Sequence, residues 1–515
     1  MHPIAHAQSR PDHPALIMAG SGETVTFGQM DEYANRFARL MRSRGLGKGD
    51  HVAILMENNV HYLQLVWGAQ RCGIMMVPIS TRLTVPEITY ILQDSDTKLL
   101  LTSTYFDSIL PALRAECPDI PMLVVGGEGD ESLEGALAAQ SPDAIPDQQP
   151  GQYMLYSSGT TGRPKGVRPA PPTEDDIQVV TPLVGLAVMG AGWPADGSMI
   201  YLSPAPLYHA APLGWCTTAH RVGGTVVVME KFDPEDALAT IEKYRITDSQ
   251  WVPTHFVRML KLDPEVRTRY DLSSHQRALH AAAPCPVPIK REMIEWWGPI
   301  INEYYAGSEG IGMTLIKAED WLAHPGSVGK AIHGTLHVCD PDGNEVPAGT
   351  DGLLFFENDT VPTYHNDPEK TAEAMHPKGW MTLGDIGHVD KDGYLYLTDR
   401  KSHMIISGGV NIYPQEIENL LVTHEKVMDA AVIGAPCPDF GEKVVAVVQP
   451  IDMAQAGEAL EAELRDFLAP SLSKIKMPKL FDFRATLPRE ANGKLYKREL
   501  RDEYKAKAEA ETEQA

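Results

Sequence analysis

The sequence has little cysteine and a deficit of basic residues, and each shortage excludes classes of protein. The 515 residues include six cysteines, which are scattered without a C-x-x-C pair. Disulfide frameworks and zinc sites need clustered cysteines, so this spacing predicts a reduced protein, and we expect a cytoplasmic location. Lysine and arginine total 45 against 69 aspartates and glutamates, which gives a formal net charge of −24. A surface this acidic repels nucleic acid and anionic membranes, so a phosphate-bearing ligand needs a focused site.

Targeting and membrane-spanning segments are also missing from the pattern. The first residues lack a basic segment followed by an apolar one, and the last residues match no lipidation or peroxisomal signal. The uncharged stretch 177–195 approaches the ~20 residues of a membrane span. Its two prolines and three glycines favour buried core or a pocket wall instead. We therefore expect neither integral membrane association nor a nucleic-acid partner.

The length and the apolar periodicity predict more than one domain. A chain of 515 residues exceeds what one compact core usually holds. Strand-like apolar runs such as 51–56 alternate with amphipathic segments such as the helix expected over 29–44. This alternation predicts an α/β fold with a largely parallel sheet. After about residue 340, closely spaced glycines separate short strands, which indicates a β-rich subdomain.

The last part of the chain has a different pattern of expected helices and strands. Pro414 suits the first turn of a helix that we expect to run to about residue 424. Strands are expected over 430–434, 444–449 and 480–483, with a helix over 458–467. The sequence thus predicts a large multi-layer N-terminal domain over 1–400, a hinge at 401–402, and a small, mobile α+β C-terminal domain over 403–515.

The strongest local signal for chemistry is the segment YSSGTTGRPKGV at 156–167. It packs four hydroxyl side chains, three glycines and Lys165 into one turn between apolar strands. Glycines let backbone N–H groups approach an anion, hydroxyls donate hydrogen bonds, and the lysine supplies positive charge. The segment is not a Walker A loop, because Gly166 follows Lys165 where that motif has Ser or Thr. Its residue types predict a cradle for a polyphosphate.

This segment resembles the phosphate-binding signature of the adenylate-forming superfamily, which includes acyl-CoA synthetases, luciferases and peptide-synthetase adenylation domains. Five more segments resemble further signatures of the superfamily and follow in its order, so the resemblance covers nearly the whole chain. They are 206–210 (PLYHA) beside the acyl site, 303–309 (EYYAGSE) at adenine and magnesium, 379–385 (GWMTLGD) at the ribose, 399–414 at the hinge and the following loop, and 488–495 (PREANGKL) with the catalytic lysine.

The resemblance implies an ATP-dependent carboxylate–CoA ligase of the acyl-CoA synthetase branch. In this branch the acid and MgATP give acyl-AMP and pyrophosphate, and CoA then attacks to give acyl-CoA and AMP. The expected small molecules are therefore ATP, Mg²⁺, CoA and a carboxylic acid, and a homodimer is expected because relatives commonly form one. The catalytic roles fall on Lys494, Glu309, Lys165 and His209, with Glu309 also holding Mg²⁺.

The same resemblance assigns the nucleotide contacts. Asp385 would accept hydrogen bonds from the ribose hydroxyls, Arg400 would reach the ribose or a phosphate, and Tyr305 would offer its ring to adenine. Ser308 stands where threonine is usual and keeps a hydroxyl for phosphate. Alanine replaces a usual glycine at Ala306. The remaining phosphate contacts are the cradle residues Ser157, Ser158, Gly159, Thr160, Thr161 and Gly162.

The hinge and the CoA contacts follow from the resemblance as well. Ser402 takes the hinge position, where aspartate or lysine is usual, and a small polar residue can still serve there. Gly409 would let the backbone sit beside the pantetheine thiol in the second half-reaction. Phe440 and Lys476 are candidates for holding the CoA nucleotide.

The acyl pocket is the site that the resemblance defines least. It is expected at His209, Trp215, Ala281, Ala282 and Gly307. The small side chains leave room for a bulky or extended acid, although the alanines could instead pack tightly under the sheet. The segments that carry these residues contain no arginine or lysine to pair with a second carboxylate. We therefore expect a medium- or long-chain, aryl or polycyclic apolar acid.

Other functions fit parts of the same sequence. Residues 306–310 (AGSEG) differ at one position from the G-x-S-x-G motif of the nucleophile elbow. This motif would make Ser308 the nucleophile of a serine hydrolase. That hypothesis leaves the cradle, Asp385 and Lys494 unexplained. A luciferase, an enzyme that loads a carrier protein, and a non-catalytic nucleotide- or acyl-binding protein are further alternatives. No carrier-like segment follows Lys494, which favours a stand-alone CoA ligase.

Overall fold

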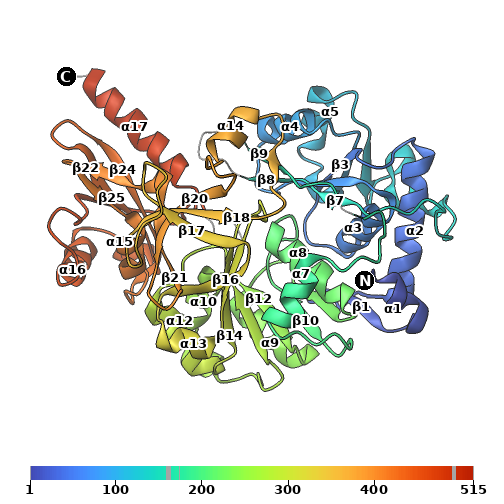
Figure 1. Ribbon diagram of the computed structural model, residues 1–515, viewed down its shortest axis with the longest axis horizontal. Coiled ribbons are helices and arrows are strands. Elements are labelled where there is room, and N and C mark those ends of the chain that lie inside the picture. Colours follow the sequence, from blue (N-terminus) through green and yellow to red (C-terminus); the bar gives the residue numbers. More distant parts are fainter. Residues whose placement is uncertain (1, 158–163, 173, 490–494, 514–515) are drawn as a thin grey trace.

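The computed structural model describes residues 2–157, 164–172, 174–489 and 495–513 (Figure 1). A large lobe holds a 13-stranded, a five-stranded and a three-stranded sheet, and a small lobe holds a second five-stranded sheet. The large lobe ends near β21 (Leu395–Arg400), and the small lobe contains the strands from β22 (Ile405–Ser407) onward. The predicted α/β fold, with a large multi-layer N-terminal part and a small C-terminal part, is confirmed.

The N-terminal five-stranded sheet is entirely parallel, as the alternation of strands and helices predicted. The longest helix of this part of the chain, α2 (Phe27–Ser43), begins with a capping box, in which the side chains of Thr26 and Gln29 each accept a hydrogen bond from the other residue's backbone N–H. The buried rings of Phe37 and Trp67 belong to the core beside this sheet. In spatial order its strands are β6 (Met122–Val125), β5 (Leu99–Ser103), β3 (His51–Leu55), β4 (Met75–Pro78) and β7 (Gln152–Tyr153).

The helices of this part are α1 (Ile4–Ser9), α3 (Val60–Cys72), α4 (Val85–Asp94), α5 (Leu110–Glu116) and α6 (Leu133–Ala138).

The long sheet has a parallel half and an antiparallel half. The parallel half contains β1 (Pro14–Met18), β10 (Ile200–Ser203), β11 (Thr225–Val228), β12 (Asp248–Trp251), β13 (Arg277–His280) and β14 (Ile301–Ala306), and β2 (Thr24–Thr26) closes its edge. The antiparallel half contains β15 (Met313–Ile316), β16 (Ser327–His333), β17 (Thr335–Cys339), β18 (Gly352–Glu357), β20 (Met381–Val389) and β21.

The expected β-rich region is present, but its predicted start near residue 340 is wrong. Antiparallel pairing already begins between β14 and β15, which a short turn joins. Gly310 has a φ of +66° in this turn, a conformation that suits glycine and lets the chain reverse without a crossover helix. The antiparallel strands extend the parallel sheet and do not form a separate layer. The region of alternating strands and helices and the β-rich region therefore meet at β14.

Helices cover both faces of the parallel half. The helix α9 (Pro234–Tyr244) starts at Asp233, whose side chain accepts from two backbone N–H groups. The others are α8 (Ala210–Arg221), α10 (Pro253–Leu260), α11 (Pro264–Arg267), α12 (Val287–Trp297) and α13 (Ala318–Ala323). The three-stranded sheet joins β8 (Leu155–Ser157), β9 (Lys165–Arg168) and β19 (Thr363–Tyr364), with α14 (Pro368–Glu373) after it.

The uncharged stretch 177–195 forms α7 (Pro182–Gly185) and the π-helix η3 (Leu186–Gly190). Leu183 and Leu186 line the cavity described below, so the predicted pocket wall is confirmed. The buried-core interpretation is wrong for Val180 and Met189, which are 56% and 85% exposed, because the segment passes along the surface. Within the described ranges, no helix is long and apolar enough to cross a membrane.

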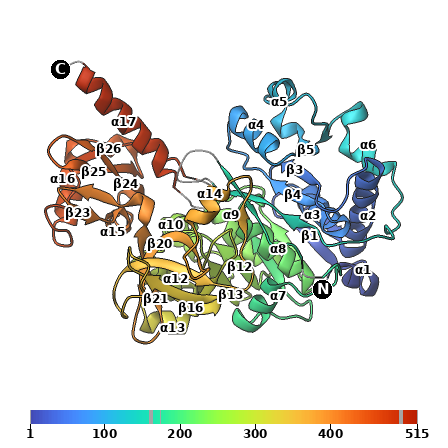
Figure 2. The same ribbon diagram turned by 45° about the horizontal axis from the view of Figure 1, so that its top comes forward.

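The small lobe is the predicted α+β unit. Its strands are β22, β23 (Val410–Ile412), β24 (Val427–Cys437), β25 (Gly441–Pro450) and β26 (Leu480–Phe483). Its helices are α15 (Pro414–Leu421), α16 (Glu458–Leu468) and α17 (Lys497–Glu513), and Figure 2 shows α17 outermost. The helix expected to reach residue 424 ends at Leu421, because the next residues form tighter turns, including one from His424 N to Leu421 O.

Candidate active site

A cavity of about 1710 Å³ lies between the two lobes, at the carboxyl ends of β12, β13 and β14. Ligands of α/β sheets bind at this edge, because loops there can converge above the strands. Many of the residues predicted from the sequence line the cavity, although their segments lie far apart in the chain. These are Lys165, His209, Trp215, Ala281, Ala282, Tyr305, Gly307, Ser308, Glu309, Asp385, Arg400 and Ser402.

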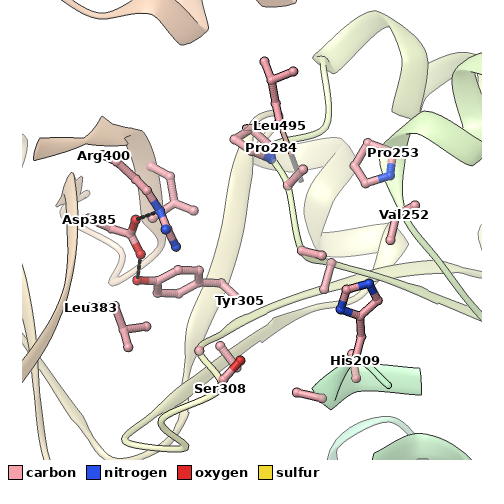
Figure 3. A pocket seen from close by; sticks show the side chains of 18 of the residues that line it. His209, Val252, Pro253, Pro284, Tyr305, Ser308, Leu383, Asp385, Arg400 and Leu495 are labelled. Atoms are coloured by element: carbon pink, nitrogen blue, oxygen red, sulfur yellow. Dashed lines mark hydrogen bonds and ion pairs between the residues drawn. The ribbon is translucent and has the colours of Figure 1, made fainter. Parts of the chain in front are cut away.

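Asp385 is held between a phenol and a guanidinium at one side of the cavity (Figure 3). Tyr305 Oη donates to one carboxylate oxygen at 2.6 Å, and Arg400 Nε donates to the other at 3.1 Å. The charge of Asp385 raises the pKa of Arg400, while burial raises the pKa of Tyr305 well above its usual value. Asp385 and Arg400 are register partners on β20 and β21, so the sheet itself places them together.

Glu309 follows β14 in the turn to β15. Tyr364 Oη donates to Glu309 Oε1 at 3.1 Å, and burial beside this carboxylate raises the pKa of the Tyr364 phenol. A Cβ on Gly307 would stand 2.8 Å from Glu309 Oε2 and 2.6 Å from Leu383 Cδ2, so any larger residue there would displace these two side chains. Carboxylate oxygen is the protein ligand that Mg²⁺ takes together with phosphate oxygens, so Glu309 fits a magnesium ion bound with ATP.

Ala306, which stands where the superfamily usually has glycine, does not disturb this turn. Ala306 remains in β14 and pairs with Met313 of β15, so the close approach falls on Gly307 instead. Ser308 is exposed in the turn and is one of the cavity-lining residues labelled in Figure 3. A nucleophile elbow needs a strand that runs into a helix, whereas here two antiparallel strands flank the serine. The serine-hydrolase interpretation is therefore wrong.

Lys165 lies at the start of β9, directly after the phosphate cradle in the sequence. Its side chain is 14% exposed, and its ammonium lies 3.7 Å from Asp367, the N-cap of α14. Burial and the charge of Lys370 lower the pKa of Lys165. Lys370 also lines the cavity, and the sequence analysis missed it together with Tyr364 because neither belongs to a recognised segment.

The opposite side of the cavity carries the predicted acyl-pocket residues. His209 is the N-cap residue of α8, and its ring lies 4.3 Å from that of Tyr208. Trp215 Nε1 donates to Tyr304 Oη at 2.9 Å. Ala282 has a φ of +77°, a conformation that costs a residue with a side chain about 1–2 kcal/mol. The methyl group of Ala282 takes up little of the cavity that it lines.

The wall around these residues is mostly apolar, with two cations that the sequence analysis did not anticipate. Pro182, Leu183, Leu186, Phe232, Val252, Pro253 and Val257 contribute apolar surface. Lys231 and Arg258 also line the cavity, although they lie outside the segments first considered. The Arg258 guanidinium lies 4.8 Å from the centre of the Phe232 ring, and burial lowers its pKa. Lys231 and Arg258 therefore bring positive charge to a cavity whose predicted acyl-pocket segments contain no arginine or lysine.

Several predicted residues lie outside the described residues or away from the cavity. Ser157 ends β8, whereas Ser158, Gly159, Thr160, Thr161, Gly162 and Lys494 lie outside the described residues. Leu495, which follows Lys494 in the sequence, lines the cavity (Figure 3).

The three predicted CoA contacts are not among the lining residues. Gly409, with a φ of +80°, lies in the exposed turn between β22 and β23, and Gly408 N donates to Phe440 O at 2.8 Å. The structure therefore brings the glycine turn and Phe440 together. Lys476 instead lies 2.6 Å from Glu416 on α15.

The hinge candidate lies where the two lobes join. Ser402 is the middle residue of the 3₁₀ turn η4 (Lys401–His403). Arg501 Nη1 of α17 donates to the Ser402 carbonyl at 2.7 Å. Asp399, the penultimate residue of β21, lies 3.5 Å from His403, so polar contacts fix the turn on both sides.

The comparisons with known proteins agree with this geometry. A family model described as AMP-binding enzyme matches residues 4–363, and one described as AMP-binding enzyme C-terminal domain matches residues 416–494. The chain therefore belongs to the AMP-binding enzyme family.

Relatives match nearly the whole length of this chain. The chain is 33% identical over 513 residues to the fatty acid–[acyl-carrier-protein] ligase ScoC of Streptomyces coeruleorubidus, covering 97% of this chain and 95% of that one. It is 31% identical to the long-chain-fatty-acid–CoA ligase FadD13 of Mycobacterium tuberculosis (strain H37Rv), covering 96% of each. ATP-bound MatB from Rhodopseudomonas palustris matches with a TM-score of 0.82 at 29% identity, covering 98% of this chain and 99% of that one.

These matches confirm the acyl-CoA synthetase branch of the adenylate-forming superfamily. The chain is an AMP-forming acid–thiol ligase, which joins a carboxylic acid to CoA through an acyl adenylate. It uses ATP, Mg²⁺ and CoA.

A buried ion pair supports the floor of the cavity. Lys290 Nζ of α12 lies 2.6 Å from Glu303 on β14, and His280 Nε2 lies 3.4 Å from the same carboxylate oxygen. Lys290 and His280 are fully buried. Burial raises the pKa of Glu303 and lowers that of His280 well below its usual value. The Lys290 ammonium opposes the rise in the pKa of Glu303 and so favours the charged carboxylate under the loop that begins at Ala281.

Replacing Lys290 by methionine should make this carboxylate an uncompensated buried charge. We expect Lys290→Met to lower the free energy of unfolding by about 3–5 kcal/mol. The pKa of Glu303 rises further without the ammonium, so the folded state binds a proton that the unfolded state has lost. Stability should therefore fall as pH rises from 5 to 8, measured by urea unfolding. The double variant Lys290→Met/Glu303→Gln should lose this pH dependence; an equal slope in both variants would contradict the assignment.

Proposed function

We propose that the acid ligated by this enzyme is apolar: a medium- or long-chain, aryl or polycyclic carboxylic acid. The observation that carries the proposal is the apolar wall beside His209, built by Leu183, Leu186, Phe232, Val252 and Val257. Short side chains at Ala281 and Ala282 leave space in front of this wall. Burying an acyl chain there is favourable by about 0.8 kcal/mol per methylene.

The nucleotide would lie on the other side of the cavity. Asp385 would accept hydrogen bonds from the ribose hydroxyls, with Arg400 beside it for the ribose or a phosphate. Tyr305 would lie against adenine, and Ser308 with the cradle residues 157–162 would donate to the phosphates. This arrangement sets the α-phosphate between Asp385 and the acyl wall, within reach of a carboxylate held near His209.

In the first half-reaction a carboxylate oxygen attacks the α-phosphorus, the bond to the β-phosphate breaks, and pyrophosphate leaves. Negative charge accumulates on the phosphate oxygens, so positioned cations lower the barrier. Lys494 would supply that charge at the α-phosphate and the attacking carboxylate, and Lys165 would supply it at the departing phosphates. Glu309 would hold Mg²⁺, which when bound neutralises phosphate oxygens.

In the second half-reaction the CoA sulfur attacks the acyl carbonyl, the bond to phosphate breaks, and AMP leaves with loss of the thiol proton. We propose that domain 403–515 turns about the hinge at 401–402 relative to domain 1–400, with Ser402 absorbing the backbone change. The turn would bring Gly409 to the pantetheine and Phe440 and Lys476 to the CoA nucleotide. Gly409 and Phe440 already share one turn region of the small lobe, which supports this grouping.

The location and assembly of the enzyme also remain proposals. All six cysteines are free, which agrees with a reducing compartment such as the cytoplasm. A homodimer is the proposed assembly.

A panel of acids tests the proposed substrate class. Release of pyrophosphate with octanoate, palmitate, cinnamate and a steroid carboxylate is compared with release with acetate and malonate. If octanoate buries four methylenes that acetate lacks, at about 0.8 kcal/mol each, the kcat/KM for octanoate should be about two hundred times that for acetate. A preference for malonate would contradict the proposal and would indicate that Lys231 or Arg258 pairs with a second carboxylate. Arg258→Met would then abolish that preference.

The two half-reactions test the roles of Lys494 and Gly409. Lys494→Ala should reduce acid-dependent ATP–pyrophosphate exchange by at least about a hundredfold, since it removes a cation from the reacting phosphate. Transfer of a supplied acyl adenylate to CoA should continue. Gly409→Leu should show the reverse pattern, because a side chain would occupy the pantetheine path.

Equal loss of both half-reactions in a folded Lys494→Ala enzyme would contradict the separate roles. A Gly409→Leu enzyme that loses pyrophosphate exchange as severely as thioester formation would contradict the assignment of that turn. A protein with no acid-dependent exchange at all would be the non-catalytic binding protein.

A further inference from the structure

A hydrogen bond joins the large and small lobes at the rim of the cavity. Arg82 lies between β4 and α4 of the large lobe, and its Nη1 donates to the backbone carbonyl of Arg489 at 2.8 Å. The two residues are 407 positions apart in the chain, and both line the cavity. The bond therefore depends on how the two lobes are placed relative to each other.

Arg489 is firmly part of the small lobe. Its Nε and Nη2 donate to the two carboxylate oxygens of Asp429 at 2.6 and 2.7 Å. Asp429 lies on β24 and also accepts from the Ala430 N–H at 2.8 Å. This two-pronged pairing with a strand residue fixes the orientation of the arginine, so the Arg489 carbonyl moves with the small lobe.

The backbone on both sides of Arg489 is tied to the chain that enters α17. Arg489 forms an antiparallel bridge with Leu495, and Tyr496 N donates to Pro488 O at 2.7 Å. Leu495 lines the cavity. Residues 490–494 connect Arg489 to Leu495 in the sequence, so Arg82 contacts the small lobe at the start of the segment that carries Lys494.

The same junction contains a repulsive pair. Glu499 of α17 has a raised pKa because of burial and the nearby charge of Glu87. Glu87 is the partner of Thr84 in the capping box of α4, so its position is fixed. The repulsion between these two negative charges opposes the approach of the lobes, and the hydrogen bond from the Arg82 guanidinium acts in the opposite direction.

We propose that Arg82 is a positioning residue for formation of the acyl adenylate. It holds the Arg489 carbonyl, and with it the small lobe, in the arrangement described here. The bond breaks when the small lobe turns for the second half-reaction, in which Arg82 has no positioning role. This inference rests on the proposed function, because it requires two half-reactions with different lobe placements.

The test compares Arg82→Met and Arg82→Lys in separate half-reaction assays. Arg82→Met removes the donor but keeps an unbranched side chain. Acid-dependent ATP–pyrophosphate exchange should fall about tenfold, the factor that one hydrogen bond from a charged group supports. Transfer of a supplied acyl adenylate to CoA should stay within about twofold of the parent rate, which one lost hydrogen bond remote from that step permits. Arg82→Lys keeps a charged donor and should recover most of the exchange.

Arg114→Met is the matched control. Arg114 is an arginine of the same lobe that pairs with Glu131 at 2.7 Å and is not among the residues lining the cavity. Both half-reactions should be unchanged in this variant. Unchanged exchange in Arg82→Met, equal loss in both assays, or loss confined to the CoA step would each overturn the inference.

Lys494→Ala in the same assays separates this inference from the proposed function. If Lys494→Ala loses exchange while Arg82→Met does not, only the role of Arg82 fails. If Lys494→Ala retains exchange, the proposed two-reaction scheme itself fails. Thermal unfolding of each variant distinguishes loss of positioning from loss of the fold.

Discussion

The active site depends on one carboxylate, Asp385, that is held on both oxygens by Tyr305 and Arg400. These contacts join three parts of the chain: the last strand of the parallel half of the sheet, the antiparallel strand β20, and the end of β21 where the chain leaves for the small lobe. In the proposed function, a nucleotide bound at Asp385 would contact Arg400, two positions before the hinge candidate. Ribose binding would then be coupled to the placement of the small lobe, because the backbone of Arg400 belongs to β21 and its guanidinium contacts Asp385.

The change from parallel to antiparallel pairing at β14 creates the room for this site. Parallel strands end together at one edge of the sheet, and the antiparallel half turns back toward that edge with β20 and β21. The cavity consequently has a polar side, supplied by the antiparallel strands, and an apolar side, supplied by α7, α8 and α10. This division suits a reaction that joins a charged nucleotide to an apolar acid. The buried pair of Lys290 and Glu303 supports the strand at which the two sides meet.

The sequence predicted the fold class, the order of the segments and twelve of the residues around the cavity, because glycine-rich turns and charged residues at strand ends have local signatures. Strand β26 has the predicted bounds. The contributions of Tyr364, Lys370, Lys231 and Arg258 could not be predicted, since each reaches the cavity through tertiary packing and belongs to no recognisable motif. The contact between Arg82 and Arg489 spans nearly the whole chain and depends on lobe placement, which local patterns do not encode. The continuation of one sheet through the α/β region and the β-rich region could not be predicted either, because packing sets the strand order across a long sheet.

The most direct test of the account is a crystal structure of the enzyme with an acyl-sulfamoyl adenosine, a stable analogue of the acyl adenylate. The account predicts that both ribose hydroxyls hydrogen-bond Asp385, that adenine lies beside Tyr305, and that the acyl group extends past His209 toward Ala281 and Val252. A ribose beyond hydrogen-bonding distance of Asp385, or an acyl group that leaves the apolar side of the cavity empty, would contradict it.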